Sequence, residues 1–254
     1  PGHEVVGTVE EVGEEVKLWK TGQRVGVGWH GGHCFECDPC RSGDFINCQN
    51  AQVSGISYDG GYAEYMTAPQ EAVAEIPEEL SSAEAAPLLC AGITVFNALR
   101  NSGIKPGNLV AIQGIGGLGH LAIQYAVKMG MRTVAISHSD SKKDLAKELG
   151  AQHFINTEKE DGSKKLQEMG GADLILATAP SAKAISSVMD GLGVNGKLMA
   201  VAATGEPVKV SPMQMLMGRK SFSGWASGTA KDSEDTLDFS ALTGTVPMIE
   251  EYPL

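Results

Sequence analysis

A glycine-rich turn between two apolar segments constrains the fold of this chain more than any other feature of its sequence. The stretch LVAIQGIGGLGHLAIQYA contains Gly114, Gly116 and Gly119 in the pattern G-x-G-x-x-G. The first glycine permits a tight turn, the second lets a pyrophosphate approach the backbone, and the third lets the following helix pack on the strand. Because the motif follows one expected strand and precedes another, with a helix between them, it predicts a dinucleotide site rather than a purely structural turn.

Apolar strand segments alternate with helical segments from residue 109 onward. Six strands separated by helices indicate an α/β fold with an open parallel sheet. The near-continuous apolar character of these strands fits burial on both faces of the sheet. The expected strands are 109–113, 133–137, 153–156, 173–179, 197–203 and 221–226.

The first 76 residues have a different pattern, in which short Val-rich runs are broken by glycine, and this predicts strands with tight turns. The expected strands lie within HEVVGTVEEVG, QRVGVGW, GGYAEYMTAP and EAVAEIP. A helix should then begin at a cap formed by Ser81 or Ser82, with Glu84 complementing its dipole. Pro87 is expected to break that helix, and a second one should end at Gly103.

The charge balance excludes some partners. Lys and Arg number 20 against 31 Asp and Glu, a net charge of −11, which argues against nucleic acid and anionic membranes. No apolar run is expected to span a bilayer. The opening PGHEVVG, without an initiator Met, and the ending MIEEYPL lead us to interpret the sequence as a piece of a longer protein.

The end of the second expected strand of the sheet bears on which dinucleotide binds. An NAD site usually presents a carboxylate to the ribose about 20 residues after the glycines. Here Ser137, His138 and Ser139 occupy the strand tip, followed by Asp140, Lys142 and Lys143. Hydroxyls and cations suit a 2′-phosphate, so we favour NADP over NAD. In the alternative interpretation the two lysines are a solvated helix face and Asp140 binds the ribose.

Four of the five cysteines lie within residues 32–48. Cys34, Cys37, Cys40 and Cys48 have the spacing C-x2-C-x2-C-x7-C, which lets one loop surround a metal. Four thiolates close the tetrahedral shell of zinc, so a zinc here would be structural. An iron–sulfur cluster also takes four thiolates and stays open as an alternative, whereas a disulfide framework is typical of small secreted domains. His33 is then surplus and is expected at the surface.

Three further residues could bind a second metal. His3, Glu4 and the isolated Cys90 are residue types that hold a catalytic zinc with one exchangeable position. The alternatives are ordinary: a lone cysteine in PLLCAGITVF is most often a small buried residue, and a His beside a Glu is most often a surface pair.

Four motifs occur in the order found in zinc-dependent medium-chain alcohol dehydrogenases: GHEVVGTVEEVG, the thiol loop, APLLCAGITVF and GIGGLGHLAIQYA. The chain resembles that family over essentially its whole length. It resembles the yeast and bacterial branch in APLLCAGITVF, and the NADP-using cinnamyl-alcohol-dehydrogenase-like branch in its glycine turn and Ser-bearing second strand. The resemblance implies a GroES-like catalytic domain at 1–91 with a structural-zinc loop at 32–48, a Rossmann domain at 92–226, and a return to the catalytic domain at 227–254.

The resemblance also implies roles for single residues. His3 and Cys90 would bind the catalytic zinc, with Glu4 as a nearby carboxylate, and the four clustered cysteines would bind structural zinc rather than an iron–sulfur cluster. The family's remaining zinc ligand and its proton-relay hydroxyl lie upstream of the GHE motif, before the first residue of this sequence. Trp29 would line the substrate pocket. The implied cofactor-binding residues are Thr94, Gly114, Gly116, Gly117, Leu118, Gly119, Ser137, His138, Ser139 and Lys142, with Ala179, Ala202 and the backbone of residues 223–225 near the nicotinamide.

The expected activity is the interconversion of a primary or small secondary alcohol and its aldehyde or ketone by hydride transfer with NAD(P). The alternatives are a catalytically impaired fragment or homologue that only binds NAD(P) and structural zinc, and a zinc-free quinone-reductase-like enzyme. The family resemblance further implies a cytoplasmic homo-oligomer, a dimer or a tetramer, acting on small molecules without nucleic acid or membrane as partners.

Overall fold

The structure is a computed structural model that describes residues 1–253 and divides them into two compact units. The first unit comprises Pro1–Asn97 together with the described residues from Ser227 onward. The second unit is the single segment Ala98–Ala226. No sheet is shared between the units, so each unit is described separately.

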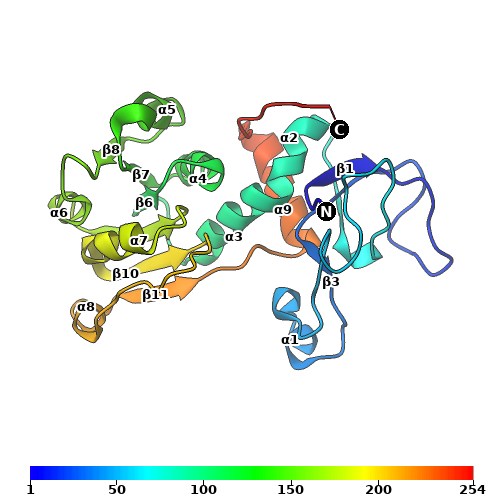
Figure 1. Ribbon diagram of the computed structural model, residues 1–254, viewed down its shortest axis with the longest axis horizontal. Helices are drawn as coiled ribbons and strands as arrows, with labels where there is room; N and C mark the ends of the chain where they lie inside the picture. The colour runs from blue at the N-terminus through cyan, green and yellow to red at the C-terminus, as the bar shows by residue number, and fades with distance from the viewer. Residues whose placement is uncertain (254) are drawn as a thin grey trace. The chain divides into compact units, whose positions relative to one another are not determined.

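A six-stranded sheet forms the centre of the second unit (Figure 1). Its strand order is β11-β10-β9-β6-β7-β8, and every neighbouring pair is parallel, as the sequence predicted. Counted along the chain from β6, this is the strand order 3-2-1-4-5-6 of a Rossmann sheet. The chain adds strands outward from β6 on one side and then from β9 on the other, so the order of addition reverses between these two parallel strands. The strands are β6 (Leu109–Gln113), β7 (Arg132–Ser137), β8 (His153–Asn156), β9 (Ala172–Ala177), β10 (Leu192–Ala200) and β11 (Ser221–Gly224).

Both faces of this sheet are covered. Ala111 and Ile175 share one buried cluster with Leu166 and Ile185, which belong to α6 and α7. Val110 and Ile112 alternate with them along β6 and are fully buried on the opposite face. The helices of this unit are α4 (Gly117–Lys128), α5 (Lys143–Glu148), α6 (Gly162–Glu168), α7 (Ala182–Val188) and α8 (Pro212–Leu216), with short 3-10 turns η4 (Asp140–Lys142) and η5 (Met189–Gly191).

The first unit is built on two small antiparallel sheets. One has the order β1-β2-β5 and the other pairs β3 with β4. The strands are β1 (Val5–Thr8), β2 (Arg24–Val27), β3 (His30–Gly32), β4 (Gln52–Val53) and β5 (Val73–Glu75). The helical segments are α1 (Asp38–Arg41), η1 (Phe45–Asn47), η2 (Gln70–Ala72), α2 (Ser82–Pro87), η3 (Leu88–Gly92), α3 (Ile93–Asn101, which continues into the second unit) and α9 (Ala230–Thr243).

The strand expected in GGYAEYMTAP is wrong, because the structure has no strand between residues 60 and 69. The segment is tied at its start, where the amides of Gly61 and Tyr62 donate to the carbonyls of Gly2 and Pro1. Beyond that point Tyr65 is 74% exposed. Tyr62 is exposed as well, so the aromatic residues of this segment cover no core face, and aromatic content without burial does not select a strand.

The helix break expected at Pro87 is also wrong. Ser81 caps α2 through a capping box with Glu84, as the sequence indicated. Directly after Pro87 the winding changes to the π turn η3, and the chain then continues into α3. The proline therefore coincides with a change of helical pitch and not with an end, and single π turns of this kind occur often at functional sites.

The continuous helical stretch Ser82–Asn101 has 20 residues and, by length and composition alone, is apolar enough to cross a membrane. A buried core helix passes the same test, so this stretch does not contradict the expectation that no run spans a bilayer. The most apolar part of this stretch is 61% buried within the protein, which is typical of a core helix.

Candidate functional site

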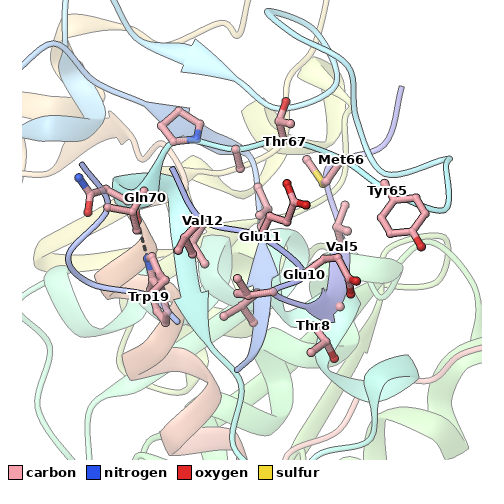
Figure 2. A pocket seen from close by; sticks show the side chains of 18 of the residues that line it. Val5, Thr8, Glu10, Glu11, Val12, Trp19, Tyr65, Met66, Thr67 and Gln70 are labelled. Atoms are coloured by element: carbon pink, nitrogen blue, oxygen red, sulfur yellow. Dashed lines mark hydrogen bonds between the residues drawn. The ribbon is translucent and has the colours of Figure 1, made fainter. Parts of the chain in front are cut away.

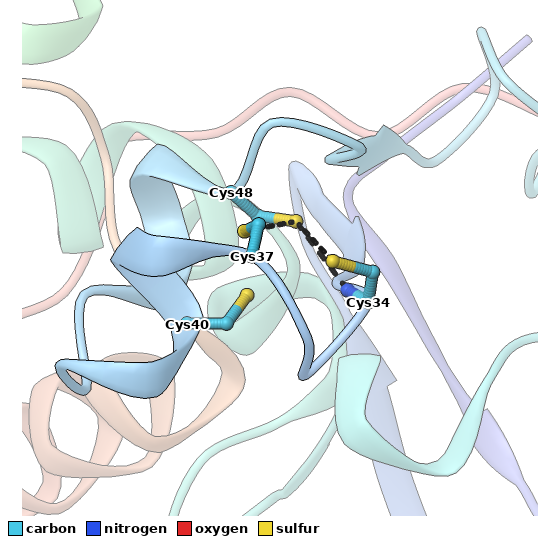
Figure 3. Close-up of side chains that lie close together, drawn as sticks. All are labelled: Cys34, Cys37, Cys40 and Cys48. Carbon is cyan, nitrogen blue, oxygen red and sulfur yellow. Dashed lines mark hydrogen bonds between the residues drawn. The ribbon is translucent and has the colours of Figure 1, made fainter.

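The thiol loop brings its four cysteines together (Figure 3). Their sulfur atoms all lie within 4.8 Å of one another, with Sγ of Cys48 at 3.8 Å from Sγ of Cys37 and 3.6 Å from Sγ of Cys34. Zinc–sulfur bonds of about 2.3 Å in a tetrahedron place sulfurs about 3.8 Å apart, so the donor set fits a single zinc ion. An iron–sulfur cluster spreads its thiolates over several irons and requires wider spacing. All five cysteines are free, which removes the disulfide alternative.

Local backbone geometry produces this convergence. Cys37 caps α1, Cys40 lies inside it, and Cys48 follows η1. The amides of Cys34 and Asn50 both point at Sγ of Cys48 at 3.3 Å. A hydrogen bond from the Asn50 side chain is the main cause that lowers the pKa of Cys34 to about 6. Hydrogen bonds also lower the pKa of Cys37, whereas burial raises that of Cys40 to about 12, so the loop alone favours only the Cys34 and Cys37 thiolates. Asn50 is a contributor that sequence reasoning missed.

The expectation that His33 is a surface residue is wrong. Its ring stacks on Phe45 and packs against Phe35, with centroid distances of 4.3 Å in both cases. Its Nδ1 lies 3.1 Å from Nε2 of His30, which is buried. Burial lowers the pKa of His33, and burial together with the neighbouring His33 charge lowers that of His30 to about 4. The physical reason is the loop's curvature, which turns His33 inward beneath two aromatic rings.

His3, Glu4 and Cys90 also meet, although 87 positions separate His3 from Cys90. Nε2 of His3 lies 3.3 Å from Sγ of Cys90, and the donor atoms of the three residues lie within 4.8 Å of one another. His3 and Glu4 directly precede β1, while Cys90 lies in the middle of the π turn η3. Imidazole, carboxylate and thiolate are all zinc ligands, so the residues present fit that ion.

The electrostatics of this cluster suit a cation. Burial, with the adjacent Glu4 carboxylate, raises the pKa of the Cys90 thiol to about 12. Glu4 is exposed as a residue, but its carboxyl group faces the cluster, and loss of hydration there raises its pKa. Without a positive charge the cluster retains protons; a divalent ion would displace them and bind the thiolate.

Trp29 lies beside this cluster. Its ring packs edge-on against His3, with centroids 5.0 Å apart and an interplanar angle of 87°. It is 37% exposed, so one part of the ring contacts the cluster and the other faces solvent. Thr94 is buried in α3, one helical turn beyond Cys90.

The glycine turn has the geometry that a pyrophosphate requires. Gly114 has φ +100°, which favours glycine, and a Cβ on Gly119 would lie 2.0 Å from the carbonyl oxygen of Gly114. A Cβ on Gly116 or Gly117 would instead meet nothing within 4 Å, which leaves the backbone open to a ligand. The hydroxyl of Thr178 lies 3.1 Å from the Gly114 carbonyl and so fixes the turn from the end of β9. Leu118 follows in the first turn of α4.

A cavity of about 670 Å³ opens beside this turn, within the second unit. Gly114 and Gly116 of the turn line it together with Ser137, His138 and Lys142. The predicted residues Gly117, Leu118 and Gly119 are not in the lining. Gln113 also lines it, and its buried Oε1 has no hydrogen-bond partner among the described residues. Sequence reasoning missed the other polar lining residues. They come from η4, from the residues just after β8 and β9, and from α7: Ser141, Thr157, Ser181, Lys183 and Ser187.

Two residues of the ribose-end prediction lie outside the cavity lining. Ser139 does not line it, and its hydroxyl instead lies 2.9 Å from that of Ser141. Asp140 does not line it either, and its carboxylate contacts Lys159 and Asn156.

A larger cavity of about 1300 Å³ lies in the first unit (Figure 2). Its walls are β1, the loop after β1 and the segment that leads into η2. The indole of Trp19, in the loop after β1, donates to the carbonyl of Gln70 in η2 at 2.9 Å. Val12, Tyr65 and Met66 give it apolar character. None of the predicted metal or cofactor residues lines it, so size alone does not identify the site.

Family models match both units of the chain. Residues 1–78 match the model described as the alcohol dehydrogenase GroES-like domain. Residues 117–241 match the model described as zinc-binding dehydrogenase.

Individual proteins agree with these matches. The alcohol dehydrogenase patD of Penicillium expansum is 49% identical over 254 residues, which are 100% of this chain and 74% of that protein. An alcohol dehydrogenase of Geobacillus stearothermophilus is 42% identical over 100% of this chain and 75% of its own length. Among solved structures, a Helicobacter pylori CAD complexed with NADP(H) superposes with a TM-score of 0.88 at 30% identity, covering 98% of this chain and 74% of that one.

Substitution of Cys48 by Ser is expected to lower the zinc content by one ion per chain and to lower the melting temperature. The sulfur of Cys48 is the one contacted by two backbone amides, so its loss opens the shell and leaves those amides unpaired. Elemental analysis and thermal unfolding check this. An unchanged zinc content would contradict the assignment of the loop, and Ser42→Ala in the same loop is the control.

Substitutions of two glycines of the turn are expected to separate folding from binding. Gly119→Ala places a Cβ against the Gly114 carbonyl and should lower the melting temperature by several degrees. Gly116→Ala meets no protein atom and should unfold like the wild type, yet bind NADPH at least about tenfold more weakly because the methyl group enters the phosphate approach. Equal effects of both on thermal stability would contradict this reading.

Proposed function

The chain belongs to the zinc-dependent medium-chain alcohol dehydrogenase family and is an NAD(P)-dependent oxidoreductase of alcohols and aldehydes; from that premise we propose which residues it uses and that it prefers NADP to NAD. We assign the metal and substrate roles to the first unit and the cofactor role to the second. The substrates are primary or small secondary alcohols and the corresponding aldehydes or ketones.

His3 and Cys90 are proposed to hold the catalytic zinc, and Cys34, Cys37, Cys40 and Cys48 the structural one. The support is chemical: four thiolates fill a tetrahedral shell, whereas one imidazole and one thiolate leave positions for an oxygen ligand. When bound, a zinc ion acts as a Lewis acid toward the substrate oxygen, and the nicotinamide accepts or returns the hydride.

The chain's own residues then have distinct tasks. His3 is positioned by the start of β1 and Cys90 by η3. These two elements therefore fix the positions of the imidazole and the thiol before substrate arrives. Glu4 supplies a carboxylate within reach of the same site, where it can hold a proton or offer a negative charge as the ligands change. Trp29 beside His3 presents a flat apolar surface that favours slender substrates.

One observation supports the cofactor preference most strongly. The described residues lining the cavity beside the glycine turn include Lys142 and Lys183 and no carboxylate. The 2′-hydroxyl of NAD is normally bound by a carboxylate, whereas the 2′-phosphate of NADP requires hydroxyls and cations. Ser137 and Ser141 supply those hydroxyls, and His138 adds a further donor.

The cell compartment and assembly are part of the same proposal. Five free cysteines, four of them in a thiolate cluster, suit a reducing environment, which supports a cytoplasmic location. Family membership supports a homo-oligomer, a dimer or tetramer.

The cofactor preference is tested by steady-state kinetics of the full-length, zinc-loaded protein with each nucleotide. We expect kcat/KM for NADPH to exceed that for NADH at least about tenfold, since a charge-assisted phosphate contact contributes about 1.5–3 kcal/mol. Lys142→Met should raise the KM for NADPH and leave that for NADH unchanged. Lys147→Met, an exposed lysine of α5 outside the cavity, is the matched control. A wild-type preference for NADH would reject the proposal.

The catalytic role of His3 is tested by His3→Ala. We expect turnover to fall at least about a hundredfold while the dissociation constant for NADPH stays within about twofold, because His3 belongs to the unit that holds metal and substrate. Full activity in a variant shown to have lost zinc from this site would show that the metal is dispensable.

A further inference from the structure

Asp140 is the carboxylate nearest in sequence to the ribose end of the cavity. His138 precedes it by two positions, and Ser141 and Lys142 follow directly, and all three line the cavity. Asp140 does not line it. The carboxylate has its contacts elsewhere, with residues that do not line the cavity.

Two residues from the end of β8 hold this carboxylate. Nδ2 of Asn156 donates to Oδ1 of Asp140 at 2.8 Å, and Nζ of Lys159 forms a short ion pair with Oδ2. Both carboxylate oxygens therefore have a donor. Each oxygen keeps a second acceptor site, but the two donors fix the direction of the carboxylate, and it does not line the cavity where a ribose would bind.

The side chain of Asn156, which holds the Asp140 carboxylate, is itself fixed in orientation. Asn156 is the last residue of β8 and is 4% exposed, and its Oδ1 accepts from the amide of Glu158 at 3.0 Å, which fixes the orientation of the side-chain amide. The amide of Thr157 donates to the carbonyl of Ser137 at 2.9 Å. The ends of β7 and β8 are thus tied together on both sides of the carboxylate.

The charges of the pair are also matched. Hydrogen bonds from Lys159 and Asn156 lower the pKa of Asp140, and the same ion pair raises the pKa of Lys159. Both groups are therefore charged at neutral pH. Lys159 is largely exposed, and a pair of this kind contributes little to fold stability, so its effect is on the direction of the carboxylate rather than on folding.

We infer that Lys159, with Asn156, withdraws the Asp140 carboxylate from the ribose end of the cavity and thereby determines the choice of NADP over NAD without contacting the cofactor. This inference rests on the proposed cofactor preference. Lys159 is a positioning residue: its ammonium group neutralises and orients a carboxylate that would otherwise repel a 2′-phosphate and attract a 2′-hydroxyl.

The test measures dissociation constants of NADPH and NADH by fluorescence titration of the full-length, zinc-loaded protein, without substrate. Lys159→Met should weaken NADPH at least about fivefold and leave NADH unchanged or tighter, so that the ratio of the two constants shifts. A purely structural defect would weaken both nucleotides together. Lys164→Met removes an equal charge from the exposed side of the neighbouring helix α6 and should leave the ratio unchanged.

A double-mutant cycle with Asp140→Asn distinguishes an indirect role from a direct one. Asp140→Asn alone should change NADPH binding by no more than about twofold, because the carboxylate is already turned away. In the Asp140→Asn background, Lys159→Met should have no further effect on the ratio. Lys159→Arg, which keeps the charge, should bind both nucleotides like the wild type.

Two results would overturn the inference. A shift of the ratio by Lys159→Met that persists in the Asp140→Asn background would mean that Lys159 acts on the phosphate directly, and an unchanged ratio would mean that it does not act on cofactor choice. Failure of the proposed function has a different signature. The wild type would then prefer NADH, and Asp140→Asn would weaken NADH selectively, which would identify Asp140 as the ribose ligand.

Discussion

The contact between the His3 imidazole and the Cys90 thiol is the constraint on which the rest of the first unit depends. It joins the residues before β1 to a π turn 87 positions later, at a distance of 3.3 Å. His3 precedes a strand and Cys90 lies within the π turn η3, so neither element alone contains both ligands. Only the meeting of strand and π turn places an imidazole, a thiol and the Glu4 carboxylate around one point, with Trp29 against the outer edge.

In the second unit, backbone geometry determines which residues meet at the cavity beside the glycine turn. The parallel register of β6, β7 and β8 delivers the glycine turn, the Ser137 tip and the Asn156 end to the same edge of the sheet. The close approach of Gly119 to the Gly114 carbonyl keeps α4 against β6 and leaves Gly116 open. We propose that cofactor choice at this edge depends on side chains from η4, α7 and the residues after the strands: hydroxyls and lysines line the cavity, and one carboxylate is held outside its lining.

The division between the metal clusters follows from coordination. The loop of four thiols is the most conspicuous feature of the sequence, but a closed tetrahedral shell leaves no position for substrate. Its contribution is to order a long excursion between β3 and β4 that contains only short helical turns. We propose that the less conspicuous cluster of His3, Glu4 and Cys90 would leave a metal an exchangeable position, because it offers fewer ligands.

Much of this could be predicted from the sequence where the signal is local. The sequence alone predicted the cysteine cluster, the glycine turn and the buried strands β6 to β9, because each depends on residues close together in the chain. The strand expected after Gly61 is absent, since aromatic residues in a sequence do not show whether a core lies beneath them. The π turn after Pro87, the inward turn of His33 and the hold of Lys159 on Asp140 depend on partners that only the folded chain brings near.

The central claim is that the thiol loop holds a closed zinc site while His3 and Cys90 hold an open one. Anomalous X-ray scattering from crystals of the full-length protein, measured on both sides of the zinc and iron absorption edges, tests it most directly. The account predicts zinc signals at both places, one enclosed by four sulfurs and one bound by His3 and Cys90 with an exchangeable oxygen. An iron signal in the thiol loop, or no metal beside Cys90, would contradict it.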